Sequence, residues 1–127
     1  MNKCLNWASF YLGVGLIGGA ATRLDGFQGQ ASFISAHSHA FSLGFIFFLV
    51  VISLEKNLKL SEVKNFDKWL VFHNVSFIYM LVTLVVRGML DGLGRDILGF
   101  SYVAGLSHAM LGVSLVWFII ILKKAIK

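Results

Sequence analysis

Four long stretches without a charged residue divide the chain. They cover residues 4–22, 31–54, 69–86 and 97–122, and each is close to or above the ~20 residues that an α-helix needs to cross a hydrocarbon core about 30 Å thick. The charged residues lie at the termini and in the three connecting segments. The pattern predicts a single all-α domain over residues 1–127, an integral membrane four-helix bundle. We expect residues 88–99, which hold four glycines, to form a tight connection.

Composition supports the same fold class. The chain is 57% hydrophobic and 13% charged, whereas in soluble domains roughly half the residues are apolar and about a quarter are charged. The formal net charge of +5 comes from lysines that flank the predicted spans, so it does not indicate a nucleic-acid surface. The single cysteine, Cys4, has no partner in the chain and is expected to be inert.

The two kinds of basic residue are separated along the chain. Every lysine lies at a terminus or in the segment 55–68, and every arginine lies in one of the other two connections. The positive-inside rule therefore predicts that both termini and the middle connection are cytoplasmic, in the cytoplasmic membrane of a bacterium. Arg23 and Arg87 would then lie at the outer surface, against the usual bias, which indicates a role beyond topology.

The candidates for chemistry are histidines, because ionisable residues inside a membrane span are costly and tend to be functional. His37 and His39 fall in the outer half of the second span, and His108 falls near the middle of the fourth. We expect His73, near the cytoplasmic start of the third span, to be interfacial. The alternative for His37, His39 and His108 is that each only forms a hydrogen bond to a neighbouring helix.

The spacing of His37 and His39 restricts what they can bind. Residues two apart on an α-helix point about 200° away from each other, so the pair would serve two sites on opposite faces. This disfavours one copper or zinc centre built from both and fits two haem irons better, since imidazole is a common axial ligand. Arg87 and Arg23 suit haem propionates, which arginine binds with two parallel hydrogen bonds. Alternatively, the two arginines anchor helix ends or pair with Asp91 and Asp25.

The segment His37-Ser38-His39-Ala40-Phe41-Ser42-Leu43-Gly44-Phe45-Ile46-Phe47 resembles the His-x-His segment in the tenth helix of the catalytic subunit of haem-copper oxidases. That subunit has twelve helices in three arcs of four, and the tenth is the second of its arc, as the His-x-His helix is here. The resemblance implies that each histidine ligates a haem iron. The chain lacks the adjacent histidine pair and the nearby tyrosine of the family's copper site, so the resemblance does not extend to oxygen reduction.

Over its whole length the chain also resembles a family of short four-span bacterial membrane proteins of unknown function. The shared features are the His-x-His helix, Arg87-Gly88 after the third span and Ser107-His108 in the fourth. This resemblance implies no activity, and the residues indicate no catalytic set.

The resulting hypothesis is a b-type haem protein for electron transfer or for haem or gas sensing, whose electron donor the sequence does not name. The metal ligands would be His37, His39 and His108, and Arg87 and Arg23 would complete the cofactor site. A homo-oligomer, by analogy a trimer, would place His39 of one chain opposite His37 of the next across a shared haem. The alternatives are a small-solute or metal-ion transporter or channel lined by the same residues, and a cofactor-free structural membrane protein.

Overall fold

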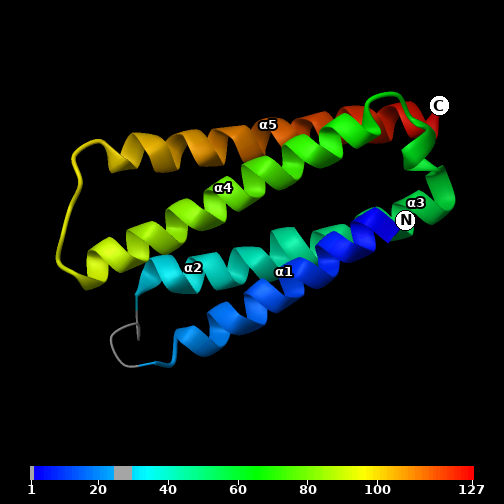
Figure 1. Cartoon of the computed structure of the whole chain (residues 1–127). Coiled ribbons are helices and arrows are strands. Elements are labelled where there is room, and N and C mark those ends of the chain that lie inside the picture. The colour runs from blue at the N-terminus through cyan, green and yellow to red at the C-terminus, as the bar shows by residue number, and fades with distance from the viewer. Residues whose placement is uncertain (1, 25–29) are drawn as a thin grey trace.

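The fold is an antiparallel bundle of four long helical rods, seen in a computed structural model that describes residues 2–24 and 30–127 (Figure 1). The second rod changes its helix type along its length, and a short 3₁₀ turn precedes the third rod. In chain order the elements are α1 (Asn2–Ala21), α2 (Ala31–His39), the π-helix η1 (Ala40–Ile46), α3 (Phe47–Leu58), the 3₁₀ turn η2 (Leu60–Glu62), α4 (Phe66–Gly92) and α5 (Phe100–Ile126).

All four rods are long and apolar enough to cross a membrane, when α2, η1 and α3 are counted as one rod. The four uncharged stretches of the sequence therefore correspond to the four rods. The expected tight connection over residues 88–99 is wrong in its first half, because α4 continues to Gly92. The salt bridge between Arg87 and Asp91, which are one turn apart, lies within the helix rather than in a loop.

The rods form two helical hairpins that pack against each other (Figure 1). One hairpin consists of α1 and the α2–α3 rod, and the other consists of α4 and α5. Both termini and the connection around η2 lie at one end, which we call the lysine end because it carries Lys3, Lys59 and Lys124. The opposite end holds the connections after α1 and after α4, with Arg23 and Arg95, and we call it the arginine end.

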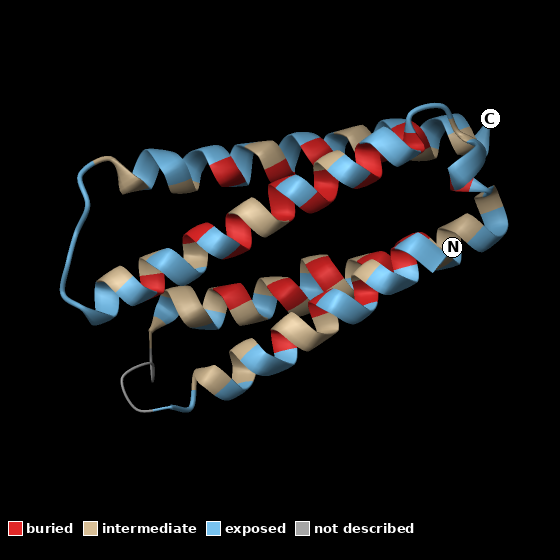
Figure 2. Ribbon diagram, in the orientation of Figure 1, coloured by how far each residue is buried: buried red, intermediate tan, exposed pale blue. Residues whose placement is uncertain are grey.

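Buried residues line the faces along which the rods meet, and the outward faces are exposed (Figure 2). Most exposed large side chains are aliphatic, as expected for surfaces that contact lipid rather than water. The core of the bundle is aromatic. Its fully buried rings include Tyr11, Phe48, Trp69 and Phe77.

Close packing in the core depends on Gly44 and Gly88. A Cβ on Gly44 would stand 2.5 Å from the Cβ of Tyr11, and one on Gly88 would stand 2.6 Å from the ring of Phe33. Only a residue without a side chain allows these approaches, so the two glycines set the distances between α1, the α2–α3 rod and α4.

Candidate functional site

His39 is the last residue of α2 and lies on the side of its rod that is turned toward the hairpin of α4 and α5. Eight residues further on, the ring of Phe47 contacts the ring of Phe118 in α5, with 5.4 Å between their centroids. The residues between His39 and Phe47 form η1, and a π turn takes up more residues than the 3.6 of an α turn. Eight residues therefore make close to two full turns, and His39 shares the side of Phe47.

The side chain of His108 is exposed on α5, on the side away from Trp117. Trp117 is nine residues further along α5, which is two and a half turns, so the two residues point in opposite directions. The ring of Trp117 contacts Phe72 on the flank of α4. The neighbouring Phe118 contacts Phe47 of α3, which places α3 on the side away from Trp117.

His39 and His108 occupy matching positions along α2 and α5. Each histidine is the eighth residue after the start of its helix at the arginine end, which puts both about 12 Å below that end at 1.5 Å per residue. The two rods also diverge toward the arginine end (Figure 1). Two imidazoles thus lie at similar depth on α2 and α5, both of which pack against α4.

The two imidazoles are oriented in the same way. Nδ1 of His39 lies 2.7 Å from the carbonyl oxygen of Ser35, and Nδ1 of His108 lies 2.9 Å from that of Ala104. Each bond runs to the preceding turn of the histidine's own helix, so Nδ1–H is the donor and Nε2 carries the lone pair. Among the described residues neither Nε2 has a hydrogen-bond partner. Metal-ligating histidines are held in this way, with one nitrogen on a carbonyl and the other available.

On α4, Thr83 lies beside α5, and Arg87 lies one turn nearer the arginine end. The hydroxyl of Thr83 lies 3.2 Å from that of Ser107, the residue before His108. Arg87 pairs with two carboxylates, its Nε lying 3.0 Å from Asp91 and its Nη1 lying 3.1 Å from Asp96. The pairing of Arg87 with Asp91 is the alternative to propionate binding that the sequence analysis gives.

His37 lies on another side of α2, against α1. Its Nδ1 is 2.7 Å from the carbonyl oxygen of Gly15, and a Cβ on Gly19 would stand 2.7 Å from its Cε1. The edge of its ring meets Phe41, with centroids 5.0 Å apart. His37 therefore joins two helices within the chain and is not part of the group formed by His39, His108 and Arg87. Arg23 follows the end of α1 at the arginine end, in the turn that closes the helix.

The interfacial position expected for His73 is wrong, because its side chain is fully buried in the core. Its Nδ1 lies 2.9 Å from the hydroxyl of Ser114, and its ring stacks on Phe47 with centroids 4.9 Å apart. Nε2 is buried without a partner among the described residues. A sequence signal existed: Trp69, His73 and Phe77 are spaced by four, which puts them on one face of a helix.

The described residues contain no group of three or more histidine, cysteine or acidic side chains that could hold a metal ion. A site that relies on several protein ligands, such as a structural zinc centre, is therefore not formed by residues 2–24 and 30–127. The described residues offer two imidazoles, those of His39 and His108, that are each oriented through Nδ1.

A model of the family described as "Protein of unknown function (DUF2871)" matches residues 1–125. No curated protein and no solved structure matches the chain.

Proposed function

We propose that this chain, which belongs to the DUF2871 family of proteins of unknown function, is a multi-pass membrane protein that binds b-type haem. Nε2 of His39 on α2 and Nε2 of His108 on α5 would hold the haem iron. The protein serves electron transfer or the sensing of haem or a gas. The observation that carries the proposal is the shared orientation of the two imidazoles, each held through Nδ1 by a backbone carbonyl at similar depth.

The surroundings suit a flat apolar macrocycle. Leu43 follows His39 by one turn on the rod, and the exposed side chain of Leu106 lies two residues before His108 on α5. Haem iron would supply one-electron redox chemistry or gas binding, which is a property of the cofactor. The chain's own residues fix the imidazoles and present Arg87 one turn of α4 beyond Thr83, nearer the arginine end.

Arg87 has donors to spare for an anionic group. A guanidinium carries five N–H donors, and the two salt bridges with Asp91 and Asp96 engage Nε and Nη1. The side chain is 38% exposed, so it is reachable from the arginine end. We propose that Arg87 binds a haem propionate and that the two carboxylates hold the guanidinium in position. Arg23 would stabilise the same end of the site as a second cation.

The proposal places the lysine end in the cytoplasm of a bacterial cell and the arginine end outside. The support is the distribution of charge: all lysines lie at one end of the bundle, and the positive-inside rule assigns such an end to the cytoplasm. The haem site then lies in the outer half of the membrane.

A shared haem between protomers, with His37 of one chain opposite His39 of the next in a trimer, is the alternative arrangement. His37 already bonds the carbonyl of Gly15 and lies over Gly19 of its own chain, which favours a packing role. A transporter or channel lined by all three histidines and Arg87 has less support, because His37 and His108 lie on different sides of the bundle.

The visible spectrum of the full-length protein tests the proposal. Protein expressed with ample haem and purified in detergent should show the Soret band of low-spin haem. His39→Ala and His108→Ala should each abolish the low-spin spectrum, whereas His37→Ala, the matched control on the same helix, should retain it. A colourless wild-type protein would reject haem binding. Loss of the band in His37→Ala but not in His108→Ala would favour the shared site.

A further inference from the structure

A groove runs along the bundle between α1 and α4, on the opposite side of α4 from α5. Three adjoining cavities of about 410, 340 and 270 Å³ form it. The first and second share Lys3, Asp67 and Leu70, and the second and third share Ile78. The groove is therefore continuous from the lysine end toward the arginine end.

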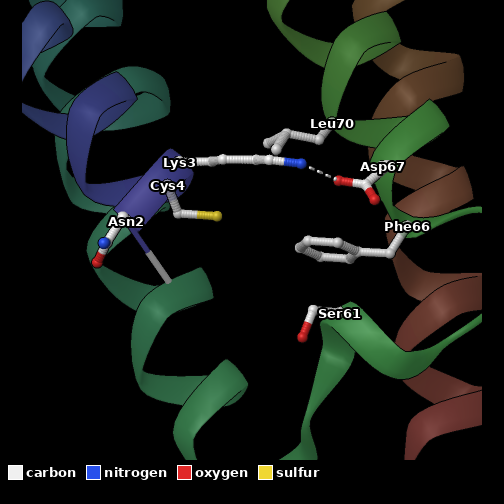
Figure 3. A pocket seen from close by; sticks show the side chains of 7 residues that line it. All are labelled: Asn2, Lys3, Cys4, Ser61, Phe66, Asp67 and Leu70. Carbon is white, nitrogen blue, oxygen red and sulfur yellow. Dashed lines mark hydrogen bonds and ion pairs between the residues drawn. The ribbon is translucent and has the colours of Figure 1, made fainter.

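The chemistry of the groove changes along its length. At the lysine end the first cavity is lined by Lys3, Ser61 and Asp67 together with the ring of Phe66 (Figure 3). The salt bridge between Lys3 and Asp67, 2.9 Å long, crosses this cavity from α1 to α4 (Figure 3). The far cavity, in contrast, is lined by apolar side chains alone: Phe10, Val14, Ile78, Leu81, Val82, Val85 and Val86.

The polar mouth is balanced in charge. Lys3 and Asp67 neutralise each other, and Asn2 adds an amide that both donates and accepts hydrogen bonds. The hydroxyl of Ser61 donates its proton to Glu55 and can accept a hydrogen bond. Such a mouth suits an uncharged head group with its own donors and acceptors. It suits a phosphate less well, because the carboxylate of Asp67 would lie beside the anion. The ring of Phe66 reaches into the cavity and offers a surface on which a planar head group can pack (Figure 3).

The groove is too long to be filled by one acyl chain of an ordinary lipid. From Asp67 to Val86 the lining of α4 covers about 28 Å at 1.5 Å per residue. The hydrocarbon core is about 30 Å thick, so an acyl chain of one leaflet covers only about half of that length. A single tail that fills the whole groove must be longer than the chains of ordinary phospholipids.

We propose that the groove binds an isoprenoid quinone or quinol, with its ring at the mouth beside Lys3 and Asp67 and its tail along α4 past Val75 and Val82. The occupant combines a planar, uncharged head that donates or accepts hydrogen bonds with one long apolar tail. The cavity at the mouth, about 410 Å³, is within the ~300–1,000 Å³ usual for small-molecule sites. The inference concerns binding alone and does not depend on haem.

Trp7 lines the middle cavity and provides a readout, since a bound quinone quenches tryptophan fluorescence. The full-length protein in nanodiscs is titrated with two benzoquinones, one with a ten-carbon alkyl tail and one with a long isoprenoid tail. Both should quench with saturation. The saturable part should decrease in Trp7→Phe, and the part that remains should come from Trp69, whose ring centroid lies 5.4 Å from that of Phe66.

The two quinones are then compared in variants that narrow different cavities of the groove. Val75→Phe narrows the middle cavity and should raise the half-saturating concentration of both quinones about tenfold, a cost of roughly 1.4 kcal/mol. Val82→Phe narrows the far cavity, so it should weaken the long-tailed quinone and leave the ten-carbon one unchanged. Val113→Phe on α5 is the matched control, because Val75, Val82 and Val113 are 55%, 52% and 59% exposed. Asp67→Asn should weaken both quinones through the head group.

Three results would overturn the proposal. Quenching that rises linearly and equally in every variant would mean that the quinone only partitions into the bilayer. A phospholipid that co-purifies with the wild-type chain and is not displaced by quinone would assign the groove to lipid. Quenching that saturates equally in wild type, Val75→Phe and Val82→Phe would place the quinone elsewhere. Gel filtration of each variant in detergent checks that it remains folded.

Discussion

Gly44 of η1 lies directly against Tyr11 of α1, so close that a Cβ on the glycine would stand 2.5 Å from the Cβ of Tyr11 and 2.9 Å from the ring of Phe77. Neither neighbour is the free end of a flexible side chain. Gly44→Ala should therefore push α1 away and lower the free energy of unfolding by about 1–3 kcal/mol. Gly112→Ala is the control, since a Cβ there meets nothing within 4 Å. Unfolding by SDS in mixed micelles measures both, and equal stability of the two variants would contradict the packing.

The hydroxyl of Tyr11 donates to Oδ1 of Asn74 across 2.7 Å inside the bundle. Tyr11→Phe should destabilise the protein by about 1–3 kcal/mol, because it leaves the buried amide oxygen without a donor. Tyr79→Phe is the matched control, as its hydroxyl makes only a 3.5 Å contact at an exposed position. Thermal unfolding followed by circular dichroism compares the two, and an equal effect would remove the special role of the buried bond.

The orientation in the membrane predicts which residues a membrane-impermeant thiol reagent can reach in intact cells. In a Cys4→Ala background, Lys59→Cys at the lysine end should stay unlabelled and Leu98→Cys at the arginine end should react. Both positions are exposed, so accessibility in the fold does not distinguish them. Labelling of both after the cells are broken open is the control. The opposite pattern would move the histidine pair to the cytoplasmic half.

Removing the charge of Arg87 should weaken haem retention. Arg87→Leu should lose haem during gel filtration, and Arg87→Lys should lie between it and the wild type, because lysine keeps the charge without the fork of donors. The ratio of Soret to protein absorbance gives the occupancy. Asp96→Asn serves as a control that removes one of the two carboxylate partners and leaves the guanidinium. Equal occupancy in wild type and Arg87→Leu would leave Arg87 as a helix-end residue held by Asp91 and Asp96.

Co-assembly separates a haem within one chain from a haem between chains. When His39→Ala and His37→Ala carry different tags and are co-purified, a site between protomers would regain low-spin haem at some of the interfaces. The pairing of His39 with His108 predicts that the mixture shows only the spectrum contributed by the His37→Ala chains. Each variant purified alone provides the reference. Additional low-spin haem in the mixed complex would place the ligands on neighbouring chains.

The four rods were predictable from sequence because a span needs a run of about 20 apolar residues, which is a property of composition that packing does not override. The residues at which the helices begin and end were less predictable. Charged residues suggested that the third span stops before Arg87, but its guanidinium pairs with Asp91 one turn later, and α4 continues. Gly88 also stays helical, where it leaves room for Phe33.

The sequence indicates which residue types form the candidate site, but it does not indicate which of these residues lie close together in the fold. His37 and His39 were separable from their spacing, but the partner of each depends on which helices pack together, and local sequence carries no such information. His73 illustrates the limit: its position near a helix end suggested an interface, whereas α5 supplies Ser114 and α3 supplies Phe47 to enclose it. The π-helix η1 likewise has no signature in its residue types.

The wide turn of η1 holds one residue more between His39 and Phe47 than a regular α-helix needs for the same facing. Deleting one residue from this segment would let it close into a regular α-helix while α1, α3 and α4 kept their places. The remaining seven steps of about 100° would still make close to two turns, so His39 would keep its side of the rod relative to Phe47. The additional residue therefore serves local packing: Gly44 lies within η1, and a Cβ there would stand 2.5 Å from the Cβ of Tyr11.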